Sequence, residues 1–345
     1  MVTMKDIANA AGVSRPTVSQ VLSGQRAGGV QISTETRKRV LETAERLGYR
    51  RNEIARSIKT GKTNVIGIIG GLQGGYSLDI ITGIAEACAA SGYFMKLLPV
   101  NNLENDTDAL GQAARQCVEH RVAGVICRSL KEHALDTLRA ELDAMHIPIV
   151  LVDSSSHHDW CSRVVSDDFA GIKEGVEFLL KQGHRKIVQV TSPLNLEYAR
   201  IRADGYLAAM RESGLPVSED MICEIDTMLE LSDNDKHKLA GFLKTNKPAA
   251  VICGSDPVAM KVLMLCHEMK IAVPDDMSVI GFAGLDYTIF SSPPLTTIKQ
   301  PFCEMGEKAF ELLLRHINGD QKIYDLKLKT SLVIRDSTWK AKGKM

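Results

Sequence analysis

The sequence predicts a small all-α head of helix-turn-helix type followed by an α/β domain of two lobes built on parallel sheets. Two observations support this fold class. The first 62 residues combine short apolar stripes at helical spacing with an excess of basic side chains. From Val65 onward, strand-like apolar runs alternate with amphipathic helical runs, the pattern of parallel strands joined by helical crossovers. A chain of 345 residues has room for two or three such domains.

Charge is divided unevenly along the chain. Residues 1–62 contain 12 lysines and arginines against 5 aspartates and glutamates, which gives a formal charge of +7. The whole chain has 42 of each kind, so the remainder holds 30 basic and 37 acidic side chains and carries −7. A basic head on an acidic body predicts that only the head meets the phosphates of a nucleic acid.

Three helices are predicted in the head. The first covers residues 4–12, with an apolar face made of Met4, Ile7, Ala8 and Ala11. After the turn at Gly12, Ser14 is placed to cap a second helix, and Pro16 lies in its first turn, where a missing N–H costs little. The third follows Ile32-Ser33 and ends at Gly48. Its apolar face consists of Val40, Leu41, Ala44 and Leu47.

The second helix is the one expected to enter the major groove of DNA. Its exposed early positions are Arg15, Pro16, Thr17, Ser19 and Gln20. An arginine binds O6 and N7 of guanine with two hydrogen bonds, and a glutamine binds N6 and N7 of adenine in the same way. Thr17 and Ser19 suit contacts to phosphates or base edges. The alternative, on pattern alone, is a three-helix bundle that binds protein and carries solvated charges.

A basic segment, residues 50–59, connects the head to the body. Asn52 is placed to cap a short helix with Ile54, Ala55 and Ile58 on one side. Eight residues are too few for a stable isolated helix in water. We therefore expect this segment to fold only against DNA or a second copy of the chain; the alternative is a plain basic linker.

The body contains two series of predicted strands. The first lies at residues 65–70, 94–100, 124–128 and 147–153, and the second at 186–191, 221–225, 250–254 and 278–281. Helices are predicted at residues 78–90, 174–182, 198–212, 257–269 and 304–317, with a last strand-like run at 326–335. Ligands in such folds bind at the carboxyl ends of the strands, between the lobes. Three side chains near strand ends are candidates to face a ligand there: Tyr76, Arg128 and Asp153.

The head and the segment after it resemble the LacI/GalR family of repressors. The resemblance rests on Met4–Ala8, Ala11–Ser14, Thr17–Ser19 and Ala55–Ile58, and it extends over the whole chain. It implies a periplasmic-binding-protein-like core in which the chain crosses between the lobes three times, here near residues 161–164, 290–293 and 320–323. The expected domains are a helix-turn-helix domain at 1–48, a hinge at 49–62 and a core at 63–345. Within the core, lobe 1 is expected at about 63–162 and 292–321, and lobe 2 at about 163–291 and 322–345.

The resemblance also implies roles for single residues. Arg15, Pro16 and Gln20 are implied as base readers, and Ile58 as the apolar wedge in the minor groove, where leucine is usual. The hinge is expected to contribute further DNA contacts from Asn52, Ala55 and Lys59. Arg202 matches the family's effector arginine, the alternative being a surface arginine of a helix. Asp256 resembles its strand-end aspartate, which accepts from ligand hydroxyls or caps the helix at 257–269.

Three positions depart from the family pattern. Ala283 stands where the family commonly carries an aspartate that accepts hydrogen bonds from a sugar or base. Leu196 and Thr227 stand where some members hold an arginine and an aromatic residue. Two alternatives stay open at this point: an unusual effector, or a pocket that is weak or unused.

The predicted function is sequence-specific DNA binding by a transcriptional regulator, expected to be a repressor. The expected partners are double-stranded DNA with a palindromic operator, a second copy of the chain, and a small-molecule effector such as a carbohydrate or related metabolite. The absence of leucine heptads after Arg335 predicts a dimer rather than a coiled-coil tetramer. The alternatives are a periplasmic-type sugar receptor without a DNA role and a cytosolic carbohydrate enzyme.

No catalytic site, cofactor or metal is expected. No nucleophile with a base is readable, and His157-His158-Asp159 with Cys161 are too close in sequence to share one tetrahedral ion easily. The eight cysteines are scattered singly, as is typical of reduced thiols. No apolar run approaches the roughly 18 residues of a membrane span, and the N-terminus has no apolar signal region. We therefore expect a cytoplasmic protein that does not bind membranes.

Overall fold

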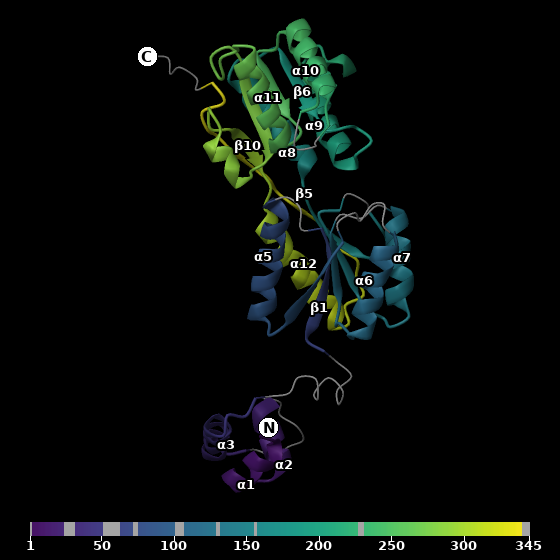
Figure 1. The fold of residues 1–345 in the computed structure, drawn as a ribbon, viewed down its shortest axis with the longest axis vertical. Coiled ribbons are helices and arrows are strands. Elements are labelled where there is room, and N and C mark those ends of the chain that lie inside the picture. Colours follow the sequence, from purple (N-terminus) through teal and green to yellow (C-terminus); the bar gives the residue numbers. More distant parts are fainter. Residues whose placement is uncertain are drawn as a thin grey trace. The chain divides into compact units, whose positions relative to one another are not determined.

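The fold was analysed in a computed structural model of the chain (Figure 1). The structure describes residues 2–23, 32–50, 63–71, 75–100, 107–128, 132–154, 157–226 and 231–339. The chain separates into two compact units, Met1–Thr63 and Asn64–Met345. We call the first unit the head and describe the second as two lobes, each built around one sheet.

The head contains the three predicted helices, α1 Met4–Ala11, α2 Arg15–Ser23 and α3 Thr34–Arg46. Thr3 and Asp6 form a reciprocal capping box at the start of α1, and Gly12 ends that helix in the left-handed conformation. One apolar core joins the helices and consists of Ile7, Ala8, Ala11, Val18, Val21, Val40 and Ala44. The prediction that Leu41 faces this core is wrong, because its side chain is 47% exposed.

Lobe 1 is built on a six-stranded parallel sheet with the order β11-β5-β4-β3-β1-β2. The strands are β1 Val65–Gly70, β2 Phe94–Pro99, β3 Val125–Arg128, β4 Ile149–Val152, β5 Ser162–Ser166 and β11 Asp325–Leu328. The helices are α5 Gly75–Ala90, α6 Thr107–Glu119, α7 Glu132–Asp143 and α12 Phe302–Ile317. Figure 1 shows α5 and α12 on one side of the sheet and α6 and α7 on the other. Both faces are therefore covered, which explains why β4 is buried along its whole length.

Lobe 2 repeats this plan with the strand order β12-β10-β9-β8-β6-β7. Its strands are β6 Ile187–Thr191, β7 Ile222–Glu224, β8 Ala250–Cys253, β9 Ser278–Ala283, β10 Thr296–Lys299 and β12 Ser331–Val333, of which β12 runs antiparallel to β10. Its helices are α8 Asp168–Lys181, α9 Glu197–Glu212, α10 Asp233–Asn246 and α11 Asp256–Glu268. Short 3-10 turns lie at η1 Glu219–Met221 and η2 Asp286–Phe290.

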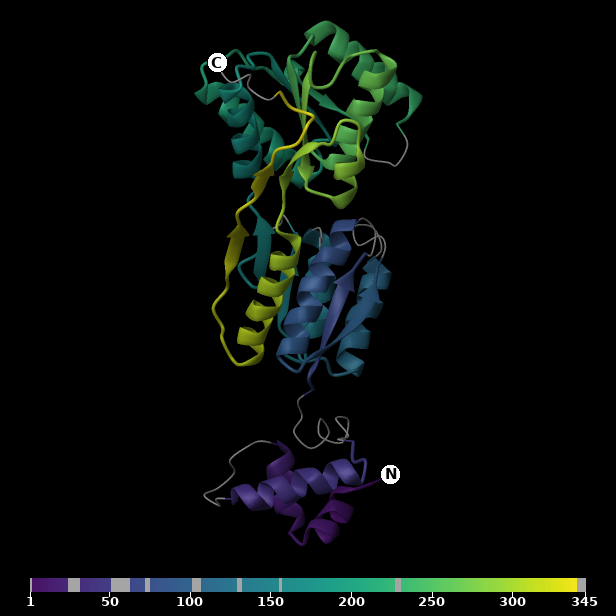
Figure 2. The same cartoon turned by 90° about the vertical axis from the view of Figure 1, so that its left-hand side faces the viewer.

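The chain passes between the lobes three times, but at later residues than the sequence indicated (Figure 2). β5 belongs to the sheet of lobe 1 and α8 to lobe 2, so the first crossing lies at residue 167. The second lies at residues 300–301, between β10 and α12, and the third at 329–330, between β11 and β12. The expected lobe boundaries at 162/163, 291/292 and 321/322 are therefore wrong. The first predicted break falls within β5, and the other two are loops inside one lobe; each crossing follows the end of the strand at or after the break.

Two glycines allow α5 and α12 to pack closely. A Cβ atom added at Gly83 would lie 1.9 Å from the carbonyl oxygen of Cys303, and one at Gly306 would lie 2.1 Å from that of Ile80. Both obstacles are backbone atoms, so a side chain fits only if a helix moves. The contact therefore requires glycine at both positions.

We expect Gly83→Ala to lower the free energy of unfolding by about 1–3 kcal/mol, because overpacking forces the backbone to shift. Urea denaturation followed by circular dichroism measures the change. Gly241→Ala in α10 is the matched control, since its added methyl group meets no atom within 4 Å, and we expect a gain of up to about 1 kcal/mol there. Equal stabilities of Gly83→Ala and the wild type would contradict the close helix contact.

Candidate functional site

The candidate cleft of lobe 1 is formed at the carboxyl ends of neighbouring strands. Arg128 is the last residue of β3, and Asp153 follows β4. The two strands are paired with Arg128 opposite Val152, so the arginine and the aspartate lie at the same edge of the sheet. The register agrees with the prediction that both residues lie at strand ends, and contact with a ligand stays a prediction.

Tyr76 joins Arg128 from the first turn of α5. The guanidinium carbon of Arg128 lies 5.0 Å from the centre of the Tyr76 ring, and its Nη1 donates to the Ser77 hydroxyl at 2.7 Å. The same ring lies 5.4 Å from the ring of Phe302 at the start of α12. The buried Nε of Arg128 finds no hydrogen-bond acceptor among the described residues. Tyr76 thus contacts both Arg128 of β3 and Phe302 of α12.

Asp153 is an acidic group in an unfavourable environment. Its backbone has a φ of 54°, the left-handed region in which aspartate and asparagine are the most tolerated side chains after glycine. Burial raises the pKa of its carboxyl group to about 6; the nearby Asp168 raises it further, and Arg128 and Arg202 counteract the shift. The charged carboxylate is thus destabilised in the folded protein.

This pKa predicts a pH-dependent stability. The folded protein holds the proton of Asp153 more tightly than the unfolded chain does, so this group reduces stability as the pH rises from about 4 to about 6. We expect Asp153→Asn to be more stable than the wild type by about 1–3 kcal/mol at pH 7–8, with the gain vanishing below pH 4. Urea titrations of both proteins across this pH range measure the difference.

The exposed Asp204 of α9 provides the control. Asp204→Asn removes the same charge from a solvated position of the same domain, and its stability is measured over the same pH range. If Asp153→Asn shows no larger rise than Asp204→Asn, the inferred burial of the Asp153 charge is wrong.

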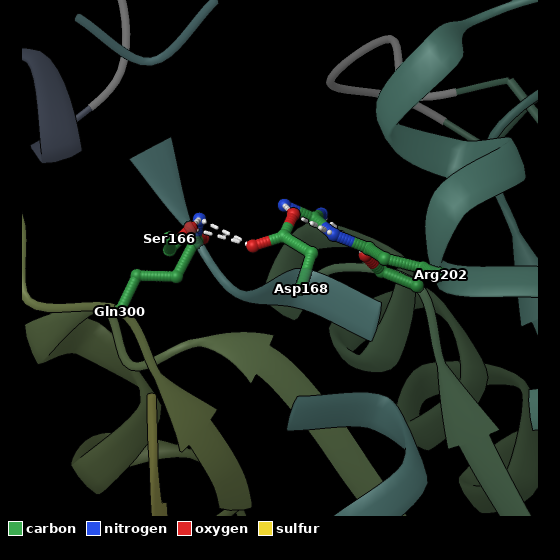
Figure 3. A network of polar contacts seen from close by, with 5 residues as sticks. Ser166, Asp168, Arg202 and Gln300 are labelled. Atoms are coloured by element: carbon green, nitrogen blue, oxygen red, sulfur yellow. Dashed lines mark hydrogen bonds and ion pairs between the residues drawn. The ribbon is translucent and has the colours of Figure 1, made fainter. Parts of the chain in front are cut away.

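Lobe 2 presents Arg202, a residue of α9 that is only 7% exposed (Figure 3). Its Nε donates to Oδ2 of Asp168 at 2.8 Å, and its Nη2 lies 2.6 Å from the same oxygen. Its Nη1 donates to the carbonyl oxygen of Gly254 at 2.7 Å. The guanidinium carbon also lies 4.1 Å from the ring centre of Phe282 and 5.0 Å from that of Tyr198. The alternative of a surface arginine is wrong.

Asp168 connects Arg202 to the crossing segments. Its Oδ1 accepts from the Ser166 hydroxyl at 2.5 Å and from Nε2 of Gln300 at 3.3 Å, and the same Nε2 donates to the Ser166 hydroxyl at 2.6 Å (Figure 3). Ser166 ends the strand before the first crossing, and Gln300 lies in the second. Sequence reasoning missed all three residues, because the crossings had been placed several residues too early.

Asp256 lies in the interior of lobe 2. It is fully buried, its Oδ2 accepts from the N–H of Leu285 at 2.8 Å, and its Oδ1 accepts from the Thr297 hydroxyl at 2.6 Å. Burial raises the pKa of its carboxyl group. The geometry therefore gives it a structural role and does not support ligand contact. The expected helix cap is also wrong, because Ser255 caps α11.

The three departures from the family pattern lie in different environments. Ala283 is buried at the end of β9, with a φ of 132°. Leu196 precedes α9 and provides no side-chain cap for it. Thr227 lies outside the described residues. No carboxylate is thus available at position 283.

The candidate DNA-reading surface is the start of α2. Arg15 and Pro16 are exposed, and Thr17, Ser19 and Gln20 are partly exposed. Ser14 caps the helix as predicted: its hydroxyl accepts from the N–H of Thr17 at 3.3 Å and lies 2.8 Å from the Thr17 hydroxyl. Both hydroxyls are therefore already engaged. The predicted hinge contacts, Asn52, Ala55, Ile58 and Lys59, lie outside the described residues.

Comparisons with known proteins agree with this arrangement. The sequence profile of bacterial regulatory proteins of the lacI family matches residues 3–52, and that of the periplasmic binding protein-like domain matches residues 176–338. The HTH-type transcriptional repressor PurR of Actinobacillus pleuropneumoniae serotype 3 is 31% identical over 341 residues, which cover 98% of each chain. The chain belongs to the LacI family. The PurR repressor of Salmonella newport is 32% identical over 342 residues, 98% of this chain and 97% of that protein.

The fold of this LacI-family chain agrees with solved structures of the family. The lac repressor dimer bound to operator and an anti-inducer superposes with a TM-score of 0.77 at 24% identity, covering 98% of this chain and 99% of that one. The predicted fold class, a helix-turn-helix head with a two-lobed periplasmic-binding-protein-like core, is therefore confirmed. The chain is a DNA-binding transcriptional regulator of this family.

Three further observations on this LacI-family protein concern membrane-spanning helices, metal ligands and cysteines. In the described part of the chain, no helix is both long and apolar enough to cross a membrane. Within the same residues, no three histidine, cysteine, aspartate or glutamate side chains gather as ligands for a metal ion. All eight cysteines are unpaired, and Cys303 is the exposed one.

Proposed function

We propose that this protein is a homodimeric transcriptional repressor whose affinity for a palindromic operator is set by a small molecule bound between the two lobes. Arg15, Pro16 and Gln20 read base edges from α2. Tyr76, Arg128 and Asp153 contact the effector from lobe 1, and Arg202 contacts it from lobe 2. The expected effector is a carbohydrate or a related metabolite.

The proposal is supported by the presence, in one chain, of a DNA-reading head and a second unit with candidate ligand-binding residues. The head offers exposed α2 side chains at the position of a recognition helix. The second unit offers an arginine and an aspartate from each lobe near the crossing segments. A ligand that favours one arrangement of the lobes changes operator affinity by a coupling free energy of typically about 1–3 kcal/mol.

A two-fold symmetric dimer explains why a palindromic site is expected, because each copy then reads one half-site. The alternative is a periplasmic-type receptor without a DNA role. It accounts for the two lobes but does not explain the helix-turn-helix head. The family membership of the head favours the regulator.

Selection of bound DNA from a random pool by the full-length chain tests the proposal. We expect enrichment of one palindromic sequence, and a change of affinity for it with at least one member of a panel of sugars and nucleobases. Sedimentation of the same preparation should give a dimer. Failure to enrich any sequence at moderate salt, with or without the panel, would contradict a sequence-specific regulator.

A further inference from the structure

Each lobe contributes one arginine and one aspartate to the candidate site. Arg128 and Asp153 come from lobe 1, and Arg202 and Asp168 come from lobe 2. The N–H of Asp153 donates to the carbonyl oxygen of Val164 in β5, the strand that leads to Asp168. The charges of Arg128, Asp168 and Arg202 influence the pKa of Asp153, and we treat the four groups as one cluster. With all four groups ionised, the cluster has no net charge.

The pair in lobe 2 is held more firmly than a surface ion pair. Two nitrogens of Arg202 contact one carboxylate oxygen of Asp168, and Ser166 and Gln300 donate to the other oxygen. The side chains of Arg202 and Asp168 are only 8% and 11% exposed. Because both oxygens of Asp168 have donors, the carboxylate cannot rotate away from Arg202 without breaking hydrogen bonds.

A charged ligand would disturb the neutral charge balance between Arg202 and Asp168. An anion that approaches Arg202 meets the carboxylate of Asp168 at 2.6 Å from the same guanidinium group, and the repulsion is poorly screened in a buried site. A neutral hydroxyl, carbonyl or amide group meets no such repulsion. Such a group also finds acceptors in the carboxylate of Asp153, the group that follows β4 in lobe 1.

We propose that Asp168 determines the charge selectivity of the cleft: by neutralising Arg202 it admits uncharged ligands and excludes phosphorylated and carboxylated ones. This inference rests on the proposed function, since it takes the cleft as the effector site. It assigns Asp168 a role in specificity that is separate from its hydrogen bonds to the crossing segments.

Inorganic phosphate is the probe that tests this role. We would measure its binding to the full-length protein by calorimetry at constant ionic strength, for the wild type and for Asp168→Asn. The asparagine keeps an oxygen for Ser166 and Gln300 but removes the charge. We expect phosphate to bind Asp168→Asn at least about tenfold more tightly than the wild type, a change that removal of one nearby like charge can produce.

Two further variants isolate the effect. Asp167→Asn removes the same charge from the neighbouring residue, which caps α8 and does not contact Arg202, and it should leave phosphate binding unchanged. Adding Arg202→Gln to Asp168→Asn should abolish the gain. Phosphate bound by the basic head contributes equally in all of these proteins. Thermal melts verify the fold of each variant, and Asp168→Ser replaces Asp168→Asn if the latter does not fold.

The inference is overturned if the wild type binds phosphate as tightly as Asp168→Asn, or if the gain survives the removal of Arg202. Operator affinity without any ligand is measured for the same variants. If the wild type does not prefer the operator over other DNA, the proposed function is contradicted. If it does prefer the operator but binds phosphate as tightly as Asp168→Asn does, only the role of Asp168 is contradicted.

Discussion

Replacement of Arg202 by leucine is expected to lower the free energy of unfolding by about 3–5 kcal/mol, the usual result of removing one partner of a buried ion pair. The substitution leaves the carboxylate of Asp168 without its cation and the carbonyl group of Gly254 without its donor. It also removes the guanidinium group from the ring of Phe282. Urea denaturation followed by tryptophan fluorescence and circular dichroism measures the change.

Arg200→Leu is the matched control for this prediction. Arg200 is an exposed arginine of the same helix, and its replacement should change stability by about 0.5 kcal/mol or less. The double variant Arg202→Leu with Asp168→Asn should recover part of the loss, because no uncompensated charge then stays buried. A single variant as stable as Arg200→Leu would contradict the buried pair.

The sequence predicted those elements of the fold that local periodicity determines. The apolar run at residues 65–70 coincides with β1, and helix 198–212 differs from α9 by one residue. The crossings between lobes were placed too early because they depend on which sheet a strand joins. Strand β5 pairs with β4 in lobe 1 and with β11, a strand more than 150 residues away in the chain, and no local pattern records this pairing.

The sequence also predicted only part of the candidate site, namely the residues at strand ends. Arg128 and Asp153 lie at strand ends, and the geometry of a parallel sheet places both at the same end of it. Asp256 also follows a strand, yet it is fully buried beneath Leu285 and Thr297, contacts made by residues 29 and 41 positions later. Asp168 was missed for two reasons: the crossing that precedes it was placed too early, and its partner Arg202 is 34 residues away on another helix. The sequence therefore did not predict which charged side chains are buried or which of them form ion pairs.

Arg15→Ala is expected to weaken binding to the selected operator by about 1–3 kcal/mol per half-site and to relax sequence choice at one base pair. The reason is that Arg15 is an exposed residue at the first turn of α2, where a recognition helix contacts base edges. Its alanine variant keeps the helix, because Ser14 still caps it. Gel-shift titrations with the operator and with each single-base variant of it measure both effects.

Lys59→Ala distinguishes base reading from general attraction to DNA. A lysine that contacts only phosphate contributes equally to every sequence, so its loss should weaken operator and scrambled DNA alike and reduce the salt dependence of binding. Arg15→Ala should instead lower operator affinity far more than affinity for scrambled DNA. If both variants lose the same factor on both sequences, Arg15 acts only as a positive charge, and the start of α2 does not read the operator through this side chain.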